Sequence, residues 1–537
     1  MAAHPAPRLG RQRPAAAGVV AAALALGVGE LVAGLVPGAG SPVVNVGNAV
    51  IDAVPAPVKE LAISIFGLAD KIALIVGILL LAAAFGALLG VVGARRFAAA
   101  VAGFVAFGAL GIAAAGSDPQ TSVVATAVAV TVAVAAGVLG LRRLLTAARG
   151  AHPAPDLRPD VAVAAPDVAA PDDSGSSRCV SVDRRTFLWL TGGLVAVAAA
   201  SAAGGRWLAQ RAGVTASRTA LVLPRPLRRA EAPPAGADLG IVGVVPFVTP
   251  NERFYRIDTA LVVPRVDVDS WRLRVTGMVQ QPLELTFDEL TAMGTEEHWT
   301  TLCCVSNEVG GGLIGNALWS GVPLHEVLDR AGVDDAASQI VGRSVDGFTA
   351  GFPTSAAYDG RAALLAVAMN GEPLPVEHGF PVRLVVPGLY GYVSATKWLS
   401  DLELTTLEAF DAYWIPRGWS KRGPIKTQSR IDVPATGARI AAGRTAVAGV
   451  AWAQANGGVQ RIEVQVDQAP WVDARLGAAL NDDTWRQWVY EWEAPPGPHV
   501  LRVRATDAEG TTQPSTRRPV APDGATGWHE VRVEVED

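Results

Sequence analysis

The chain has 537 residues, of which 50% are hydrophobic, and its mean hydropathy is +0.30. This length allows several domains, and the apolar excess lies before about residue 205, so a membrane segment precedes a more polar one. The formal net charge of -5 and the lack of a basic face with interleaved aromatic residues exclude a nucleic-acid partner. Three cysteines also exclude a disulfide framework.

Four apolar runs open the chain, and each has about the 20 residues that cross a hydrocarbon core. They are Ala15–Val36, Ile72–Val92, Phe97–Ala115 and Val123–Leu141. The arginines that flank them belong on the cytoplasmic side by the positive-inside rule: Arg8, Arg11, Arg13, Arg95, Arg96, Arg142, Arg143 and Arg149. We therefore predict a four-helix membrane segment over residues 1–149, with Val43–Lys71 outside as an interfacial helix.

Residues 150–183 are rich in Ala, Pro, Asp and Ser without periodicity, which predicts a disordered cytoplasmic linker that contains Cys179. Residues 184–206 begin with Arg184-Arg185 before an apolar run, which resembles a twin-arginine export signal. The alternative is a fifth transmembrane helix with positive residues on its inner side. Both interpretations predict a multi-pass protein of the cell membrane, surrounded by lipid, with an extracytoplasmic catalytic domain.

The histidines bear on electron transfer. None of the seven lies inside an apolar run, and no Cys-x-x-Cys-His occurs. Because a haem between membrane helices usually needs axial histidines, no haem is expected. Electrons would then pass to an external electron-transfer protein or to a quinone-linked partner.

Short alternating runs begin near residue 249. Residues 271–275 alternate as a strand, and Thr286 and Glu289 have the spacing of a capping box. Mixed strands and helices predict an α+β domain over residues 225–430. Beyond it, alternation at 462–466, 488–492, 501–505 and 531–535 predicts an immunoglobulin-like β-sandwich over residues 431–537, without the antibody disulfide because it has no cysteine.

Two adjacent cysteines, Cys303 and Cys304, stand in the first of these two domains. Adjacent cysteines are poor candidates for a structural disulfide. The pair is either a thiolate offered to a metal or two small buried hydrophobes, and by itself it favours the second. The glycine-rich loop Glu308–Gly312 that follows either brings backbone amides to a ligand or is simply flexible.

The segment Thr301–Asn307 resembles the Thr-Leu-x-Cys-x-x-Asn segment of the sulfite oxidase family of molybdenum enzymes. Further segments resemble the same family in the same order: Trp319–Leu324, Met369–Pro375, Glu377–Arg383, Val386–Gly388 and Lys397–Leu399. The strands after residue 431 resemble the family's C-terminal dimerisation domain, which implies a homodimer through that domain.

The resemblance implies a molybdenum-molybdopterin cofactor (Mo-MPT) and two-electron oxygen-atom transfer, with Cys304 as the metal ligand. It places Arg256 beside a small oxyanion or oxo substrate and beside the cofactor. The further residues that it assigns to cofactor binding are Asn307, His378, Arg383 and Lys397. Cys304 and Arg256 are thus the predicted catalytic residues.

Two departures leave the substrate open. The family usually carries a tyrosine in the segment where this chain has Ala366–Ala368. It also usually carries Gly-Ala-Arg directly before the lysine that matches Lys397, and this chain has the segment Gly391–Thr396 there. Tyr390 or Tyr392 could supply a hydroxyl instead. One alternative function is reduction of a sulfoxide or another oxidised small molecule with the same cofactor. Another is a cofactor-free, membrane-anchored binding module.

Overall fold

The computed structural model describes residues 12–36, 38–55, 58, 65–66, 69–116, 118–119, 121–149, 184–211 and 214–537. The chain divides into two compact units, Met1–Ala212 and Gly213–Asp537. The predicted linker over 150–183, with Cys179, lies outside the described residues, and so do Arg8 and Arg11.

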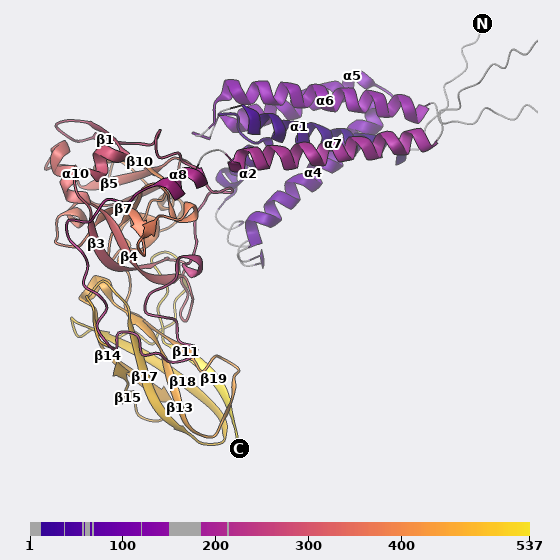
Figure 1. Cartoon of the computed structure of the whole chain (residues 1–537). Coiled ribbons are helices and arrows are strands. Elements are labelled where there is room, and N and C mark those ends of the chain that lie inside the picture. Colours follow the sequence, from indigo (N-terminus) through magenta and orange to yellow (C-terminus); the bar gives the residue numbers. More distant parts are fainter. Residues whose placement is uncertain are drawn as a thin grey trace, which may run out of the picture. The chain divides into compact units, whose positions relative to one another are not determined.

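The first unit is a bundle of apolar helices (Figure 1): α1 (Gln12–Leu35), α2 (Pro42–Ala53), α4 (Asp70–Gly93), α5 (Phe97–Ala115), α6 (Val123–Arg149) and α7 (Arg184–Arg211). Helix is confirmed in all four predicted apolar runs. Five helices, α2 excepted, are long and apolar enough to cross a membrane. Small residues let the backbones approach closely, since a Cβ at Gly86 would lie 2.7 Å from the carbonyl oxygen of Gly18.

Helix α2 occupies the start of the segment predicted as an interfacial helix. Ser41 caps it, because its side chain accepts a hydrogen bond from the Val44 N–H, and Pro42 begins the first turn. Val43 and Asn45 are buried, and the helix packs against α4 and α5. The buried face of α2 therefore packs on the other helices. An interfacial helix would instead turn its apolar face to lipid.

The second unit begins with α8 (Val214–Ala220) and an irregular segment that contains the single turn η2 (Asn251–Arg253). One five-stranded sheet has the order β2 (Leu283–Thr286), β1 (Arg272–Gly277), β10 (Leu399–Thr405), β5 (Gln339–Ser344), β6 (Thr349–Pro353). The other has the order β3 (Glu296–Cys303), β4 (Ile314–Pro323), β7 (Leu364–Met369), β8 (Glu372–Pro373), with β9 (Arg383–Val385) paired to β7. The strands β1 and β10 are parallel, and the other pairs are antiparallel.

Short helices join these strands: α9 (Phe287–Thr291), α10 (Leu324–Ala331), α11 (Gly391–Ser394), η3 (Thr354–Ala357) and η4 (Val376–His378). The predicted capping box is confirmed at α9. The Thr286 hydroxyl accepts from the Glu289 N–H at 3.1 Å, and the Glu289 carboxylate accepts from the Thr286 N–H at 2.9 Å. One hydrophobic core, which includes Trp319, Leu365 and Leu402, joins both sheets.

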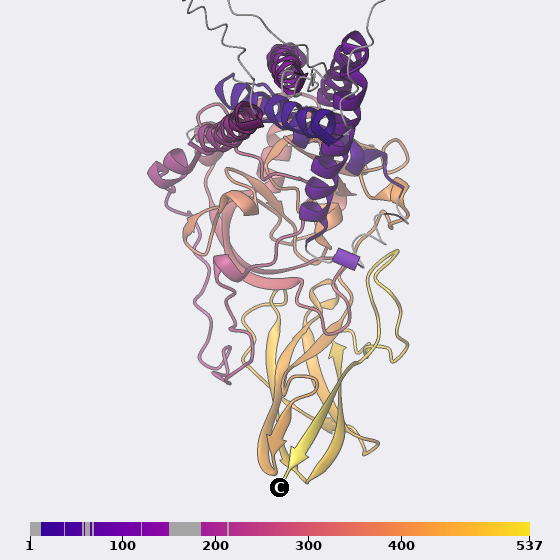
Figure 2. The same ribbon diagram turned by 90° about the vertical axis from the view of Figure 1, so that its right-hand side faces the viewer.

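The C-terminal strands form two further sheets around a shared core that includes Val447, Trp488 and Val503. One has the order β11 (Gln428–Val433), β13 (Gly443–Trp452), β17 (Arg486–Ala494), β16 (Arg475–Leu476). The other has the order β12 (Arg439–Ala441), β19 (His529–Glu536), β18 (Gly497–Asp507), β14 (Val459–Val466), β15 (Val472–Asp473). All four predicted alternating runs are strands, and in both views they lie together in the orange-to-yellow part of the second unit (Figures 1 and 2).

Candidate functional site

The two cysteines stand where β3 ends. Cys303 is the last residue of the strand, and Cys304 begins a turn in which the Asn307 N–H donates to the Cys304 carbonyl at 3.0 Å. The Cys304 N–H donates to the Leu313 carbonyl at 2.9 Å, which closes the loop between them. Cys303 is 2% exposed and Cys304 8% exposed. Since successive side chains of an extended segment point to opposite sides, the two thiols meet different neighbours.

Those neighbours make the cysteines unequal. Burial raises the pKa of Cys304, but interactions with Ser306 and the charge of Lys397 oppose this rise. Burial and the neighbouring Cys304 raise the pKa of Cys303 well above its usual range, and Asn307 and Arg430 oppose it. Cys304 is therefore the thiol that faces the cationic part of the site.

Lys397 and Arg256 share one carboxylate. The Lys397 ammonium donates to Asp258 Oδ2 at 2.7 Å, and Arg256 Nε donates to the same oxygen at 2.8 Å. Asp258 has a side chain that is only 4% exposed, whereas the Arg256 side chain is 38% exposed. Burial lowers the pKa of Lys397 to about 8, although Asp258 opposes this shift. The site thus has an inner cation and an outer one, bridged by a buried acid.

Arg383 is a third, deeper cation. It is 5% exposed, it donates from Nη1 to the His378 carbonyl at 3.1 Å, and its guanidinium lies 5.0 Å from the centre of the Trp319 ring. Within residues 214–537, no carboxylate lies within ion-pair distance of it. Burial lowers its pKa to about 10, so it stays charged at neutral pH. A buried charge without a carboxylate is unfavourable unless another anion is present.

His378 packs beside Arg383. Its Nε2 lies 3.2 Å from the carbonyl oxygen of Asn251, so Nε2 carries the proton and Nδ1 is the acceptor. Burial, then Arg383 and Lys397, lower the pKa of His378 to about 4. The ring is therefore neutral at pH 7.

Gly379 explains why His378, Arg383 and Lys397 can meet. Its φ is 109°, in the region that favours glycine, and a Cβ here would lie 3.0 Å from Lys397 Cβ and 3.1 Å from Arg383 Cβ. Lys397 and Arg383 thus both approach Gly379, the glycine of the Glu-His-Gly-Phe-Pro motif, because it has no side chain.

Asn370 has a structural role that the motif did not reveal. Asn370 and Gly371 have φ values of 51° and 80° and form the tight turn between β7 and β8. Asn370 Nδ2 donates to the Thr249 carbonyl at 3.0 Å and to Asn251 Oδ1 at 2.8 Å. These bonds hold the segment that carries Arg256 against the second sheet.

Asn307 combines a structural bond with an unsatisfied donor. Its Oδ1 accepts from the Leu313 N–H at 2.8 Å, while its buried Nδ2 has no oxygen or nitrogen acceptor in the described part of the chain and lies near the Cys303 thiol, whose pKa it lowers. The loop after it packs on the C-terminal sheets, because Arg430 donates to the Gly311 carbonyl at 2.8 Å and a Cβ at Gly310 would strike the His529 ring. These protein contacts hold the loop, against the alternative that it is simply flexible, and its approach to a ligand stays a prediction.

The two tyrosines expected to replace the missing one are bonded elsewhere. The Tyr392 hydroxyl donates to the Ser420 carbonyl at 2.6 Å, and the Tyr390 hydroxyl accepts from the Lys426 N–H at 3.3 Å. Tyr255 is the better-placed tyrosine. Burial, then Cys304 and Cys303, raise its pKa, and Arg383 opposes them.

Sequence reasoning missed Tyr255, Asp258 and Asp346. Burial raises the pKa of Asp346, with a smaller contribution from Asp258. A signal existed for Asp258, because in an extended segment it shares a face with Arg256 two residues earlier. No local signal pointed to Asp346, which lies in the turn between β5 and β6.

The donor set fits an anionic cofactor that carries a metal. Arg256, Lys397 and Arg383 bring more positive charge than the carboxylate of Asp258 balances, and charged donors of this kind bind phosphate strongly. The unpaired Asn307 Nδ2 is a further donor, and the Cys304 sulfur is a soft ligand for a transition metal.

Comparisons with known proteins agree with this chemistry. Residues 260–414 match the family model of the oxidoreductase molybdopterin binding domain. The chain is 30% identical to the mitochondrial sulfite oxidase of Mus musculus over 340 residues, 54% of this chain and 62% of that protein. It is 35% identical to the uncharacterized oxidoreductase YuiH of Bacillus subtilis over 157 residues, 29% of this chain and 76% of that protein.

Among solved structures, the chain is similar to the sulfane dehydrogenase SoxCD from Paracoccus pantotrophus. The TM-score is 0.48 at 22% identity, over 59% of this chain and 91% of that chain. The chain spans 62% of the length of the mouse sulfite oxidase.

Proposed function

Because the chain belongs to the sulfite oxidase family of molybdopterin-dependent oxidoreductases, we propose that it catalyses two-electron oxygen-atom transfer with Mo-MPT. The observation that carries the proposal is Cys304 beside buried cations whose charge exceeds that of the carboxylate bonded to them. When bound, the cofactor supplies the redox-active metal. The protein holds it, orients it and excludes water.

Cys304 is the proposed metal ligand. Its pKa is raised by burial, so the thiol alone stays protonated at neutral pH. A bound cation of high charge ionises a coordinating thiol, and the nearby Lys397 favours the same thiolate. Cys303, which lacks this environment, has no proposed role in binding the metal.

Arg383, Lys397, His378 and Asn307 are the proposed cofactor contacts. Arg383 would gain a phosphate as the anion that its surroundings lack, and Lys397 would become more basic beside it. The neutral His378 ring presents Nδ1 as an acceptor for an N–H donor. Asn307 Nδ2 would gain the acceptor that the described chain does not provide.

Arg256 is the proposed substrate contact. It is the most exposed of the three cations, and its two bonds to Asp258 fix the guanidinium plane. The remaining N–H groups suit a small oxyanion or oxo substrate. Arg256 also belongs to the proposed cofactor-binding set, through its link to Lys397.

A second candidate function is reduction of sulfoxides or other oxidised small molecules. It is supported by the buried segment Ala366–Ala368, which carries no hydroxyl, and by the hydroxyls of Tyr390 and Tyr392, which are bonded to main-chain groups. The sulfite oxidase family usually has a tyrosine in this segment, whereas here Tyr255, which interacts with both cysteines and with Arg383, lies on a different segment. The comparisons do not favour the cofactor-free binding module.

The proposed location is the cell membrane, with the catalytic domain outside the cytoplasm. Five apolar helices and their flanking arginines support it, and Arg184-Arg185 supports export by a twin-arginine pathway. Replacement of both arginines by lysine should abolish export under that pathway; normal export would refute it. The two C-terminal sheets support an immunoglobulin-like domain and a homodimer through it.

The test is metal analysis of the full chain, purified in detergent. We expect about one molybdenum per chain, with turnover in either sulfite oxidation with a dye acceptor or sulfoxide reduction with a dye donor. The direction that is active decides between the two candidate functions. An active protein without molybdenum would overturn both.

A further inference from the structure

Asp258 is the acid of the cationic site, the group formed by Arg256, Asp258, Arg383 and Lys397. Its Oδ2 accepts from the Lys397 ammonium at 2.7 Å and from Arg256 Nε at 2.8 Å, and its Oδ1 accepts from Arg256 Nη2 at 3.3 Å. Lys397 also donates to the Glu377 carbonyl at 3.2 Å. Asp258 is therefore bonded to two cations at once, and its single negative charge neutralises one of their two positive charges.

The charge of Asp258 is shielded from water. The side chain of Asp258 is 4% exposed and that of Lys397 is 10% exposed. Charges in such a position act on one another more strongly than charges in bulk water, because less water and salt screen them. A ligand bound at Arg256 would therefore feel a change of one charge at Asp258.

Asp346 shows that Asp258 acts on a neighbouring group through its charge. Asp346 lies in the turn between β5 and β6, where it accepts from the Phe348 N–H at 3.2 Å. Burial, and then the charge of Asp258, raise the pKa of Asp346, whereas Ser344, Phe348 and Lys397 lower it. The field of Asp258 thus extends beyond the two cations that it binds.

The bonds of Asp258 determine how much charge is left for a substrate. Arg383 is a proposed partner of the cofactor's phosphate, which leaves Arg256 and Lys397 on the side of the proposed substrate contact. Together with Asp258 these two residues present one net positive charge. It matches the first negative charge of a ligand, whereas a second negative charge would lose its hydration without gaining a partner.

We propose that Asp258 determines the specificity of the site by charge, so that neutral or singly charged oxo compounds are accepted as substrates and dianions are disfavoured. This inference rests on the proposed function and names its substrate class. Asp258 also positions Arg256, but positioning alone would treat ligands of one shape alike. A charge acts on each ligand in proportion to the ligand's own charge.

The experiment compares three ligands of similar tetrahedral shape: sulfate is a dianion, methanesulfonate is a monoanion, and dimethyl sulfone is neutral. Isothermal titration calorimetry measures their dissociation constants with the full chain in detergent. Asp258→Asn keeps the shape of the side chain and removes its charge. It should tighten binding of methanesulfonate about tenfold and of sulfate about a hundredfold, which is roughly 1.4 kcal/mol for each ligand charge. Dimethyl sulfone should stay within about threefold of the wild type.

Two variants serve as controls. Asp258→Glu retains the charge and should keep the wild-type order of the three affinities. Asp473→Asn removes one carboxylate from an exposed pair with Arg461 in the C-terminal strands, and it should leave all three constants within about threefold. An equal change for all three ligands in Asp258→Asn would show a purely structural role and overturn the proposal.

The wild type supplies a second test that does not depend on the folding of a variant. It should bind sulfate no more tightly than methanesulfonate, because the second charge of sulfate finds no further uncompensated cation. A wild type that prefers sulfate by about tenfold or more would overturn the proposal.

Molybdenum content and dye-linked turnover of the same preparations separate this inference from the proposed function. An active molybdenum enzyme whose Asp258→Asn variant responds equally to the three ligands would refute the charge selectivity alone. A wild type without molybdenum and without turnover would refute the proposed function, and a response graded by ligand charge in that protein would leave the role of Asp258 standing.

Discussion

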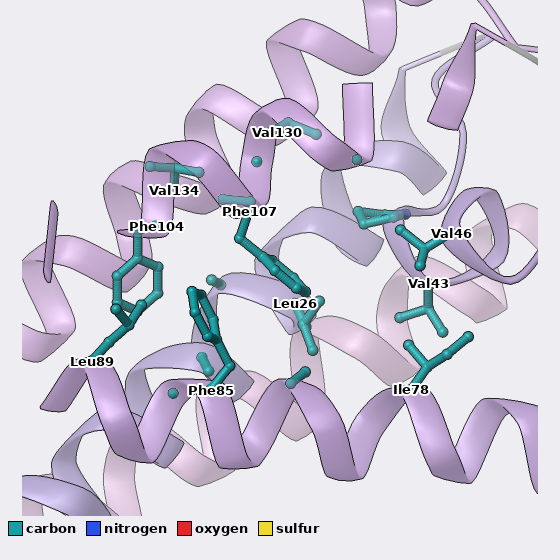
Figure 3. A pocket seen from close by; sticks show the side chains of 18 residues that line it. Leu26, Val43, Val46, Ile78, Phe85, Leu89, Phe104, Phe107, Val130 and Val134 are labelled. Atoms are coloured by element: carbon teal, nitrogen blue, oxygen red, sulfur yellow. The ribbon is translucent and has the colours of Figure 1, made fainter. Parts of the chain in front are cut away.

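The cationic site around Arg383 lies in the second unit, and an apolar hollow that is partly open lies among α1, α2, α4, α5 and α6 of the first unit (Figure 3). They differ in the charge and polarity of the residues that line them. The cationic site holds more positive charge than the carboxylate of Asp258 neutralises, whereas the hollow has an uncharged, almost wholly apolar lining. An excess of buried positive charge favours an anionic ligand, whereas an apolar lining gives no preference for a charged one. The uncompensated charge of the cationic site therefore indicates the class of ligand that it binds.

The largest expected effect distinguishes the two cysteines of the cationic site. Cys304→Ser should lower turnover about a thousandfold, equivalent to roughly 4 kcal/mol of barrier, because it removes the proposed metal ligand. Cys303→Ser, as the control, should stay within about threefold of the wild type. Steady-state assays with metal analysis check both, and equal losses would refute the assignment.

The second effect is a pH dependence of stability due to His378. Its pKa is about 4 when folded and ordinarily 6.5, so between these values the folded state binds fewer protons than the unfolded state. Its contribution is complete above pH 6.5 and falls by up to about 3 kcal/mol as the pH drops through 4. Urea unfolding of the wild type and His378→Gln between pH 4 and 7 measures it.

The variant His378→Gln should show a flatter dependence on pH, because its amide does not titrate there. His529, whose pKa is also about 4, contributes equally to both proteins and cancels in the difference. Parallel curves for the two proteins would show that His378 is not the group responsible.

A third prediction tests whether the buried charge of Arg383 is unfavourable until an anionic ligand binds. Arg383→Met should raise the unfolding free energy of the cofactor-free protein by about 1–2 kcal/mol, since it removes an unpaired buried charge, and should lower molybdenum content severalfold. Arg430→Met is the control, because Arg430 is equally buried but bonded to Asp432 at 2.6 Å. It should destabilise the protein, and the same sign in both variants would contradict the comparison.

The smallest effect is expected at Arg256, the most exposed of the three cations. Arg256→Gln should raise KM about tenfold, roughly 1.4 kcal/mol, and leave molybdenum content unchanged, because the cofactor retains its deeper contacts. A loss of metal would show instead that Arg256 acts mainly through Asp258 and Lys397.

Several features were determined by the sequence alone, because their signals are local. The apolar runs predicted helices by length, the alternating residues predicted strands, and Thr286 with Glu289 predicted a cap. Motifs in a shared order predicted the family. The helix, strand and cap signals each lie within one short segment, and each family motif is also short, although the motifs together extend from Thr301 to Leu399.

The tertiary structure decided which charges meet. Lys397 and Asp258 are 139 residues apart, and no periodicity predicts their ion pair. The same holds for Asn370, whose bonds to Thr249 and Asn251 show that a motif residue supports the site and need not touch a ligand. It also holds for the apolar hollow, which is lined by residues of α1, α2, α4, α5 and α6. Contacts between distant segments depend on how whole helices and strands pack. No short stretch of a single sequence predicts that packing.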